Sequence, residues 1–275
     1  MSRYIYLIVL TLIIRPATAQ DLQGVIYDQS TKKPLPYISI GITGKNVGTL
    51  STENGTFSFR RAVLDKYPGD TLKISGLGYK TKVYRIAEGA FVPAEIFMEP
   101  EIIILPEVIV GNFREEKILG TRSESKNVVT GWSSIGSGGE RGIKLDLGKK
   151  KALLKTVSFF ISQNKYSQVY FRIHIRSLSQ DQPGAELIRE NIISKTSIPE
   201  GWVNVDVQDQ QIVASGDIMV SVEVIRVTGT CQEKSCLLFS GKMLKGTLYA
   251  KEAAQGVWQI KHSFSPGIYL TALYP

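Results

Sequence analysis

Hydrophobic and polar residues alternate in short stretches along most of the chain after residue 21. In one of the clearest stretches, Ile38, Ile40 and Ile42 share one face of an extended segment. Alternation with a period of two is typical of β-strands that bury one face. About seven such stretches lie between residues 22 and 99, with turn residues and no helix-period segment between them. They predict a small antiparallel β-sandwich.

The dipeptide Asn54-Gly55 lies between two of these stretches. Asn-Gly is a strong hairpin signal, because both central residues of a type I′ turn need a positive φ. Phe57 and Phe59, which follow directly, would point to one face of the next strand. We therefore expect a β-hairpin at the centre of this sandwich.

The alternation returns at residue 128 and continues to the C-terminus. Within residues 167–178, one face of a predicted strand is hydrophobic and the other is polar: Val169, Phe171, Ile173 and Ile175 against Tyr170, Arg172, His174 and Arg176. About eight strands or more, without a clear helix, predict a second and larger all-β domain over residues 128–275, a jelly-roll or galactose-binding-like β-sandwich. Residues 111–127 are charged and poor in hydrophobic side chains, which favours an inter-domain linker.

The first 19 residues have the layout of a secretory signal peptide. Arg3 supplies a positive start, residues 4–14 are almost wholly hydrophobic, and Ala17-Thr-Ala19 offers a small-residue cleavage site. The hydrophobic run is too short to span a bilayer comfortably. We expect an exported protein, periplasmic, outer-membrane-associated or secreted, with no transmembrane segment after removal of residues 1–19. The net charge then falls from +8 to +6, because Arg3 and Arg15 are lost.

Cys231 and Cys236 are the two cysteines of the chain. In an exported protein, a local disulfide that closes a small surface loop is the expected arrangement. The alternatives are two free thiols or half of a metal site. Zinc would need two further ligands, and His174 and His262 show no ligand spacing. We therefore predict the disulfide and no metal.

Sets of residues that carry catalysis are mostly absent from the sequence. A zinc carboxypeptidase needs two histidines and a glutamate on one metal, and neither histidine has a His-x-x-Glu neighbour. No Gly-x-Ser-x-Gly elbow of a serine hydrolase occurs, and the glycine-rich residues 136–142 lack the Lys-Ser/Thr pair of a phosphate-binding loop. Export and interleaved acidic residues disfavour nucleic acid as a partner. We expect a protein that is not an enzyme and has no cofactor.

Several motifs in residues 22–100 occur in an order and at spacings that resemble a known family. They are Gly24-Val-Ile-Tyr-Asp28, Pro34-Leu-Pro-Tyr37, Gly48-Thr-Leu-Ser-Thr-Glu-Asn-Gly-Thr-Phe-Ser58, Asp70-Thr-Leu-Lys-Ile-Ser75 and Gly78-Tyr-Lys80. Together they resemble the carboxypeptidase-regulatory-like domain of exported Bacteroidetes proteins, a transthyretin-like sandwich of seven strands, and we assign residues 20–110 to it. The resemblance implies a non-catalytic accessory module of the kind found beside peptidases and in front of outer-membrane transporters. The second domain looks, more loosely, like the C-terminal sandwich often paired with this module.

Residues 101–110 resemble the segment that follows this domain in TonB-dependent, nutrient-importing outer-membrane proteins. There, a Leu-Asp-Glu-Val-Val-Val stretch contributes an energy-coupling strand, whereas here Pro106 stands in place of the usual acid. We favour a last sandwich strand followed by a linker. The alternative is an adaptor that offers residues 102–110 as an added strand to a TonB-like or outer-membrane transport partner.

Arg172, His174 and Arg176 form a basic row on one face of their predicted strand. The row could receive an anionic or sugar ligand, and the ring of Trp258 could stack on a sugar. The interpretation we favour for the row is a solvated outer face. These four residues are the candidate ligand surface of a protein that we expect to contact a glycan or an envelope protein.

Overall fold

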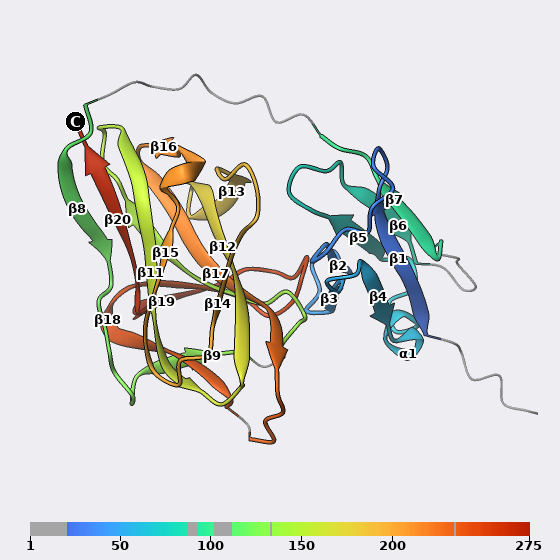
Figure 1. Ribbon diagram of the computed structural model, residues 1–275. Helices are drawn as coiled ribbons and strands as arrows, with labels where there is room; N and C mark the ends of the chain where they lie inside the picture. Colours follow the sequence, from blue (N-terminus) through green and yellow to red (C-terminus); the bar gives the residue numbers. More distant parts are fainter. Residues whose placement is uncertain (1–20, 87–92, 102–111, 133, 234) are drawn as a thin grey trace, which may run out of the picture.

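The computed structural model describes residues 21–86, 93–101, 112–132, 134–233 and 235–275 (Figure 1). Strands make up nearly all of its regular structure, as the predicted all-β class requires. None of the helices in these ranges has the length and hydrophobicity of a membrane span. The predicted signal peptide and the predicted coupling strand at residues 102–110 lie outside the described residues.

The described part of the N-terminal domain, residues 21–86 and 93–101, is a sandwich of seven short strands with one helical turn. The elements are β1 Leu22–Asp28, β2 Ser39–Ile42, β3 Gly48–Leu50, β4 Thr56–Phe59, α1 Arg61–Leu64, β5 Thr71–Ser75, β6 Lys82–Arg85 and β7 Glu95–Met98. One sheet has the order β4-β1-β7 and the other β3-β2-β5-β6. Ile26, Ile40 and Leu72 are fully buried between them. The predicted seven-stranded sandwich is confirmed, although β1 and β7 run parallel and the turn α1 was not predicted.

The hairpin predicted at Asn54-Gly55 is wrong. Strand β3 pairs with β2 and strand β4 pairs with β1, so the two strands on either side of the turn belong to different sheets. The turn itself exists: the Gly55 amide donates to the Thr52 carbonyl at 2.9 Å. Gly55 has a positive φ of 72°, whereas Asn54 does not, so the pair lacks the two positive φ angles that the prediction assumed. The segment is a corner that carries the chain from one layer to the other.

The second domain is larger and also has two layers. Its elements are β8 Glu115–Gly120, β9 Val129–Gly131, β10 Glu140–Asp146, β11 Ala152–Asn164, β12 Gln168–Ser179, β13 Gln182–Glu186, β14 Ile192–Thr196, β15 Gly201–Asp206, η1 Gln208–Gln210, β16 Val213–Ala214, β17 Asp217–Thr228, β18 Leu237–Lys251, β19 Gln259–Pro266 and β20 Ile268–Tyr274. The strands follow the order β13-β12-β17-β10-β18-β11-β20-β8. Strand β18 takes part in both layers, because its beginning pairs with β11 and its end with β10.

Aromatic rings from both layers fill the core of this domain. Phe159 of β11 lies 4.9 Å from the ring of Phe171 in β12 and 4.9 Å from that of Phe239 in β18, measured between ring centroids. The hydrophobic face predicted for β12 is fully buried in this core. The predicted second all-β domain is thus present, and its jelly-roll or galactose-binding-like type stays a prediction.

The predicted linker at residues 111–127 is wrong for its central part. Residues Glu115–Gly120 form strand β8, which pairs along its whole length with β20. Leu119 packs against the core, whereas the charged side chains of β8 face solvent. Charged side chains on a strand at the edge of a sheet prevent pairing with other chains. The charge that suggested a linker therefore belongs to an edge strand.

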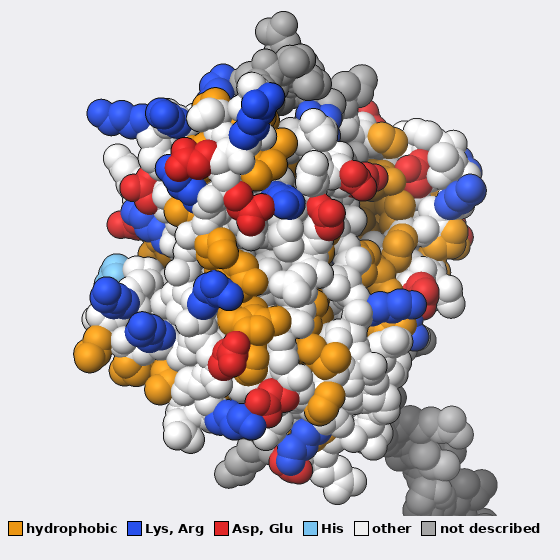
Figure 2. All heavy atoms as spheres, turned by 60° about the vertical axis from the view of Figure 1, so that its left-hand side comes forward, with side chains coloured by type: hydrophobic (Ala, Val, Ile, Leu, Met, Phe, Trp, Pro, Cys, Tyr) orange, Lys and Arg blue, Asp and Glu red, His pale blue; other side chains and the backbone are white. Residues whose placement is uncertain are grey.

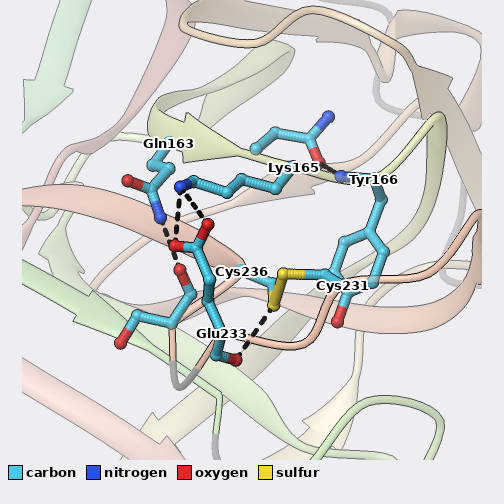
Figure 3. Close-up of a disulfide and its surroundings, with 8 residues drawn as sticks. Gln163, Lys165, Tyr166, Cys231, Glu233 and Cys236 are labelled. Carbon is cyan, nitrogen blue, oxygen red and sulfur yellow. Dashed lines mark hydrogen bonds and ion pairs between the residues drawn. A yellow bond between two sulfur atoms is a disulfide. The ribbon is translucent and has the colours of Figure 1, made fainter.

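The predicted disulfide between Cys231 and Cys236 is confirmed. It closes the turn between β17 and β18 (Figure 3). The turn is attached to the sandwich by the Lys165 amide, which donates to the Cys236 carbonyl at 2.9 Å, and by an ion pair of 2.5 Å between Lys165 and Glu233.

The two domains meet where the loop between β18 and β19 reaches the N-terminal sandwich. Ala254 in that loop is buried against two glycines, Gly41 of β2 and Gly48 of β3. A Cβ atom at Gly41 would lie only 2.1 Å from the Ala254 carbonyl oxygen, so these glycines permit the close approach. Farther along the loop, the Gln255 carbonyl accepts from the Gly44 amide at 2.9 Å. The contact fixes the cleft that lies beside it.

Candidate functional site

The basic row of β12 lies beneath the N-terminal domain and not in solvent. Arg172 is 4% exposed and His174 is 9% exposed. The favoured interpretation, a solvated outer face, is therefore wrong. Alternation does place the row opposite the hydrophobic face of β12, as the sequence indicates. The neighbouring domain covers Arg172, whose Nη1 group donates to the Tyr37 carbonyl oxygen at 2.8 Å.

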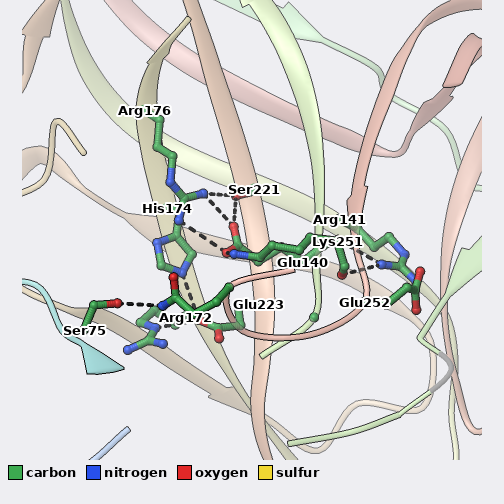
Figure 4. A network of polar contacts seen from close by, with 12 residues as sticks. Ser75, Glu140, Arg141, Arg172, His174, Arg176, Ser221, Glu223, Lys251 and Glu252 are labelled. Carbon is green, nitrogen blue, oxygen red and sulfur yellow. Dashed lines mark hydrogen bonds and ion pairs between the residues drawn. The ribbon is translucent and has the colours of Figure 1, made fainter. Parts of the chain in front are cut away.

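Three glutamates from other strands neutralise the row, and Figure 4 shows two of them, Glu140 and Glu223. Glu223 of β17 lies directly opposite Arg172 in the strand register, and Glu140 of β10 lies opposite Glu223. The third carboxylate belongs to Glu186, at the end of β13. Two carboxylates side by side in a protein interior require nearby cations, because burial of unpaired charge is strongly unfavourable.

His174 lies at the centre of this cluster. Its Nε2 atom is 2.9 Å from Glu223 Oε2, and its Nδ1 atom is 2.7 Å from Glu186 Oε1. Glu223 Oε2 also accepts from Arg172 Nε at 2.7 Å. A histidine with a carboxylate oxygen at each ring nitrogen is best satisfied when both nitrogens carry protons.

Arg176 and Lys251 complete the cluster on the side of Glu140. Arg176 contacts Glu140 Oε2 at 2.6 Å and Glu186 Oε1 at 2.6 Å. Lys251 of β18 contacts Glu140 Oε1 at 2.5 Å, and the Ser221 hydroxyl donates to Glu140 Oε2 at 2.7 Å. Three carboxylates thus face three permanent cations and His174, and each charge is held by several contacts.

The pKa values of the buried carboxyls follow from this arrangement. Burial alone raises the pKa of Glu140, but the neighbouring cations, Arg176 first among them, hold the pKa well below its usual range. Burial also raises the pKa of Glu223, but the charged neighbours, Arg172 first among them, lower it to about 2. Both carboxyls therefore stay ionised at neutral pH.

The pKa of His174 moves in the opposite direction. Burial lowers the pKa of this side chain and Arg176 does the same, whereas Glu140 and Glu186 raise it. The net result is a pKa above the ordinary histidine value, because the carboxylates outweigh both opposing effects.

Trp258, which the sequence suggested as a stacking platform, belongs to the same cluster. The Arg176 guanidinium lies 5.6 Å from the centre of its ring, and Lys251 Nζ lies 4.9 Å from it. These are cation–π contacts, so the ring supports the two cations of the cluster. The structure therefore brings all four candidate residues together, with Trp258 as a partner of the cations.

A cleft of about 570 Å³ opens between this cluster and the N-terminal domain. Its walls are mostly polar, with Ser39, Lys73 and Ser75 on one side and Arg172, Glu186 and Asn191 on the other. Within the described part of the chain, Glu186 Oε2 is buried and accepts no hydrogen bond. A buried carboxylate oxygen without a donor is uncommon in folded proteins.

A metal ion fits this cluster poorly. Glu140, His174 and Glu223 offer ligand atoms within 4.8 Å of one another. However, Arg172 and Lys251 already contact the two carboxylates, and a divalent cation would lie close to both. The charge balance therefore favours the protein's own cations at these oxygens.

Sequence reasoning missed the glutamates and Lys251. One signal could have indicated Glu223: residues 218–225 are hydrophobic except for Ser221 and Glu223, which fall on one face of the strand. Two polar residues on one face of an otherwise hydrophobic strand indicate a covered polar cluster. No comparable local signal marks Glu140 or Glu186.

Comparison with known proteins gives a match for the N-terminal domain. Residues 22–110 match the family model of the CarboxypepD_reg-like domain. No curated protein matches the chain. Solved structures show only weak similarity, beginning with the cysteine protease and lectin-like domains of Cwp84, a surface-layer-associated protein of Clostridium difficile. That match has 10% identity and a TM-score of 0.37, and covers 51% of this chain and 33% of that chain.

The VP2 subviral particle of infectious bursal disease virus gives a TM-score of 0.28 at 10% identity, with 87% of this chain and 57% of that chain covered. The chain spans less than two thirds of either structure, and the low scores support no argument about fold or function. The family model agrees with the resemblance found in the sequence motifs and with the seven-stranded sandwich. The chain therefore carries a CarboxypepD_reg-like domain, of a regulatory and non-catalytic class, at residues 22–110.

Proposed function

We propose that this protein is a non-catalytic, exported binding protein of the bacterial cell envelope that holds a glycan in the cleft between its two domains. The observation that carries the proposal is the polar lining of the cleft, where the Glu186 side chain on one wall is 23% exposed and Lys73 lines the other wall. A sugar hydroxyl would donate to the Glu186 carboxylate in a charge-assisted hydrogen bond. Lys73 on the opposite wall would donate to other hydroxyls of the same ligand.

The state of the charged groups supports binding more than catalysis. A carboxyl with a pKa of about 2, as at Glu223, is a weak base, and the pKa of Glu140 is also lowered. A useful acid or base has a pKa near the working pH. Both ring nitrogens of His174 contact carboxylate oxygens, which leaves no nitrogen for a substrate proton. A charged network of this kind fixes the positions of its own side chains and offers hydrogen bonds to a ligand.

Export is supported by two independent features. The signal-peptide pattern of residues 1–19 predicts passage through the inner membrane. The Cys231–Cys236 disulfide suits an oxidising compartment, since thiols stay reduced in the cytosol.

A glycan array probed with residues 20–275 tests the proposal. We expect retention of a defined set of glycans, and at least about tenfold weaker retention for Glu186→Gln and for Lys73→Ala, because each removes a charged hydrogen-bonding partner. Lys66→Ala is the matched control, since Lys66 is an exposed lysine of the same domain outside the cleft. Melting temperatures show whether each variant is folded. No retained glycan, or retention that neither folded cleft variant weakens, would overturn the proposal.

A further inference from the structure

The β18–β19 ribbon has an exposed corner at residues 242–246 and 261–263. The strand register breaks here: Met243 pairs with Phe264, and Thr247 pairs with His262. Three residues of β18 therefore face one residue of β19, which forms a large bulge. The corner lies on the part of β18 between its pairing with β11 and its pairing with β10.

The most exposed residue of the corner is hydrophobic and has an unfavourable backbone conformation. Leu244 is 85% exposed and has a φ of 69°, and Met243 beside it is 52% exposed. A bulky side chain at positive φ is an outlier, and glycine would occupy this position without steric cost. Leu244 gains no burial from the fold in exchange, so its conformation and exposure both indicate a contact outside the domain.

Positive charge surrounds these two hydrophobic side chains. Lys242, Lys245 and Lys261 are all exposed, and the ion pairs of the described residues include none made by these lysines. The Asp181 carboxylate, which interacts with His262, is already paired with Lys144 at 2.9 Å. Figure 2 shows lysine or arginine side chains beside a histidine, with hydrophobic side chains below them, on the left of the molecule.

We propose that this corner docks onto an anionic lipid surface. Met243 and Leu244 would enter the boundary between headgroups and acyl chains, while the three lysines would remain at the phosphate groups. Flexible unbranched stems allow lysine to keep its charge in water as its neighbours sink into the lipid. Two exposed hydrophobic side chains between exposed lysines favour an anionic lipid surface, which offers hydrocarbon and phosphate together. The cleft plays no part in this contact.

Flotation of residues 20–275 with lipid vesicles tests this proposal. We expect binding to vesicles of phosphatidylcholine with phosphatidylglycerol, weakened by salt, and no binding to phosphatidylcholine alone. Leu244→Gly should weaken binding roughly tenfold or more, because it removes the side chain that would be buried in the lipid. The same change relieves the positive-φ conformation, so it should not unfold the protein. Each of Lys242→Ala and Lys245→Ala should weaken binding about fivefold.

Val83→Ser is the matched control, since Val83 is an exposed hydrophobic residue of the N-terminal domain and is 61% exposed. It should leave vesicle binding unchanged. The proposal is overturned if the unmodified protein does not float with anionic vesicles, or if Leu244→Gly floats as well as the unmodified protein. Glycan retention by Leu244→Gly should equal that of the unmodified protein, which separates this contact from the cleft.

Discussion

The substitution Glu223→Gln removes one negative charge from the buried cluster and changes the shape of the side chain little. Glu223 Oε2 accepts from Arg172 Nε at 2.7 Å and lies 2.9 Å from His174 Nε2. The side chains of Glu223 and Arg172 are only 3% and 5% exposed, so water cannot solvate Arg172 in place of the lost carboxylate. Arg172 would then be a buried cation without its carboxylate.

Removal of one partner from a buried ion pair typically costs about 3–5 kcal/mol. Glutamine keeps a carbonyl oxygen as acceptor, so we expect the lower end, about 3 kcal/mol. For a domain of this size, that cost corresponds to a fall in melting temperature of roughly 6–12 °C. Urea unfolding followed by tryptophan fluorescence, together with calorimetry, would measure both quantities. The reduced charge should also lower the pKa of His174, which NMR titration would detect.

Glu233→Gln is the matched control, because it removes the same charge from an exposed ion pair. Glu233 contacts Lys165 at 2.5 Å, but its side chain is 57% exposed. Exposed pairs contribute about 0–1 kcal/mol, so this variant should be nearly as stable as the unmodified protein. Equal losses of stability in the two variants would refute the argument that burial makes the Glu223 charge important.

Three further results are expected. Gly41→Ala should push the loop that contains Ala254 away from the N-terminal domain, because the new Cβ would lie 2.1 Å from the Ala254 carbonyl oxygen. Small-angle scattering should then show a larger radius of gyration. Unchanged scattering would contradict the close contact. Stability should fall on both sides of neutral pH. It should fall as the pH drops through the lowered pKa values of the buried carboxyls Glu140 and Glu223. It should also fall as the pH rises through the raised pKa of His174, because the stabilisation by protonated His174 is complete only below about 6.5. Urea unfolding across pH measures this, and a flat profile would exclude it. Reduction of the Cys231–Cys236 disulfide should cost about 2 kcal/mol, since it closes a short loop; calorimetry with and without reductant would show it, and an unchanged melting temperature would contradict it.

Local sequence patterns determined much of the fold because strand alternation and turn chemistry depend on neighbouring residues. The period of two in β12 placed Phe171 and Arg172 on opposite faces before any pairing was known. The motifs around Asn54-Gly55 located a turn and identified the N-terminal domain, which the family model confirms. The two cysteines indicated their own bond, because their spacing suits a local loop.

Tertiary structure alone decided which segments pair with these strands and what covers their faces. The turn at Asn54-Gly55 joins two sheets because β3 and β4 find distant partners, and a local turn signal carries no information about pairing partners. The charged stretch at β8 is an edge strand because β20, more than a hundred residues later, pairs with it. Likewise, the polar face of β12 became the wall of a cleft because the N-terminal domain covers it and glutamates from three other strands neutralise it. Which residues share a face is a local property of the backbone, whereas what covers that face depends on contacts between segments far apart in the sequence.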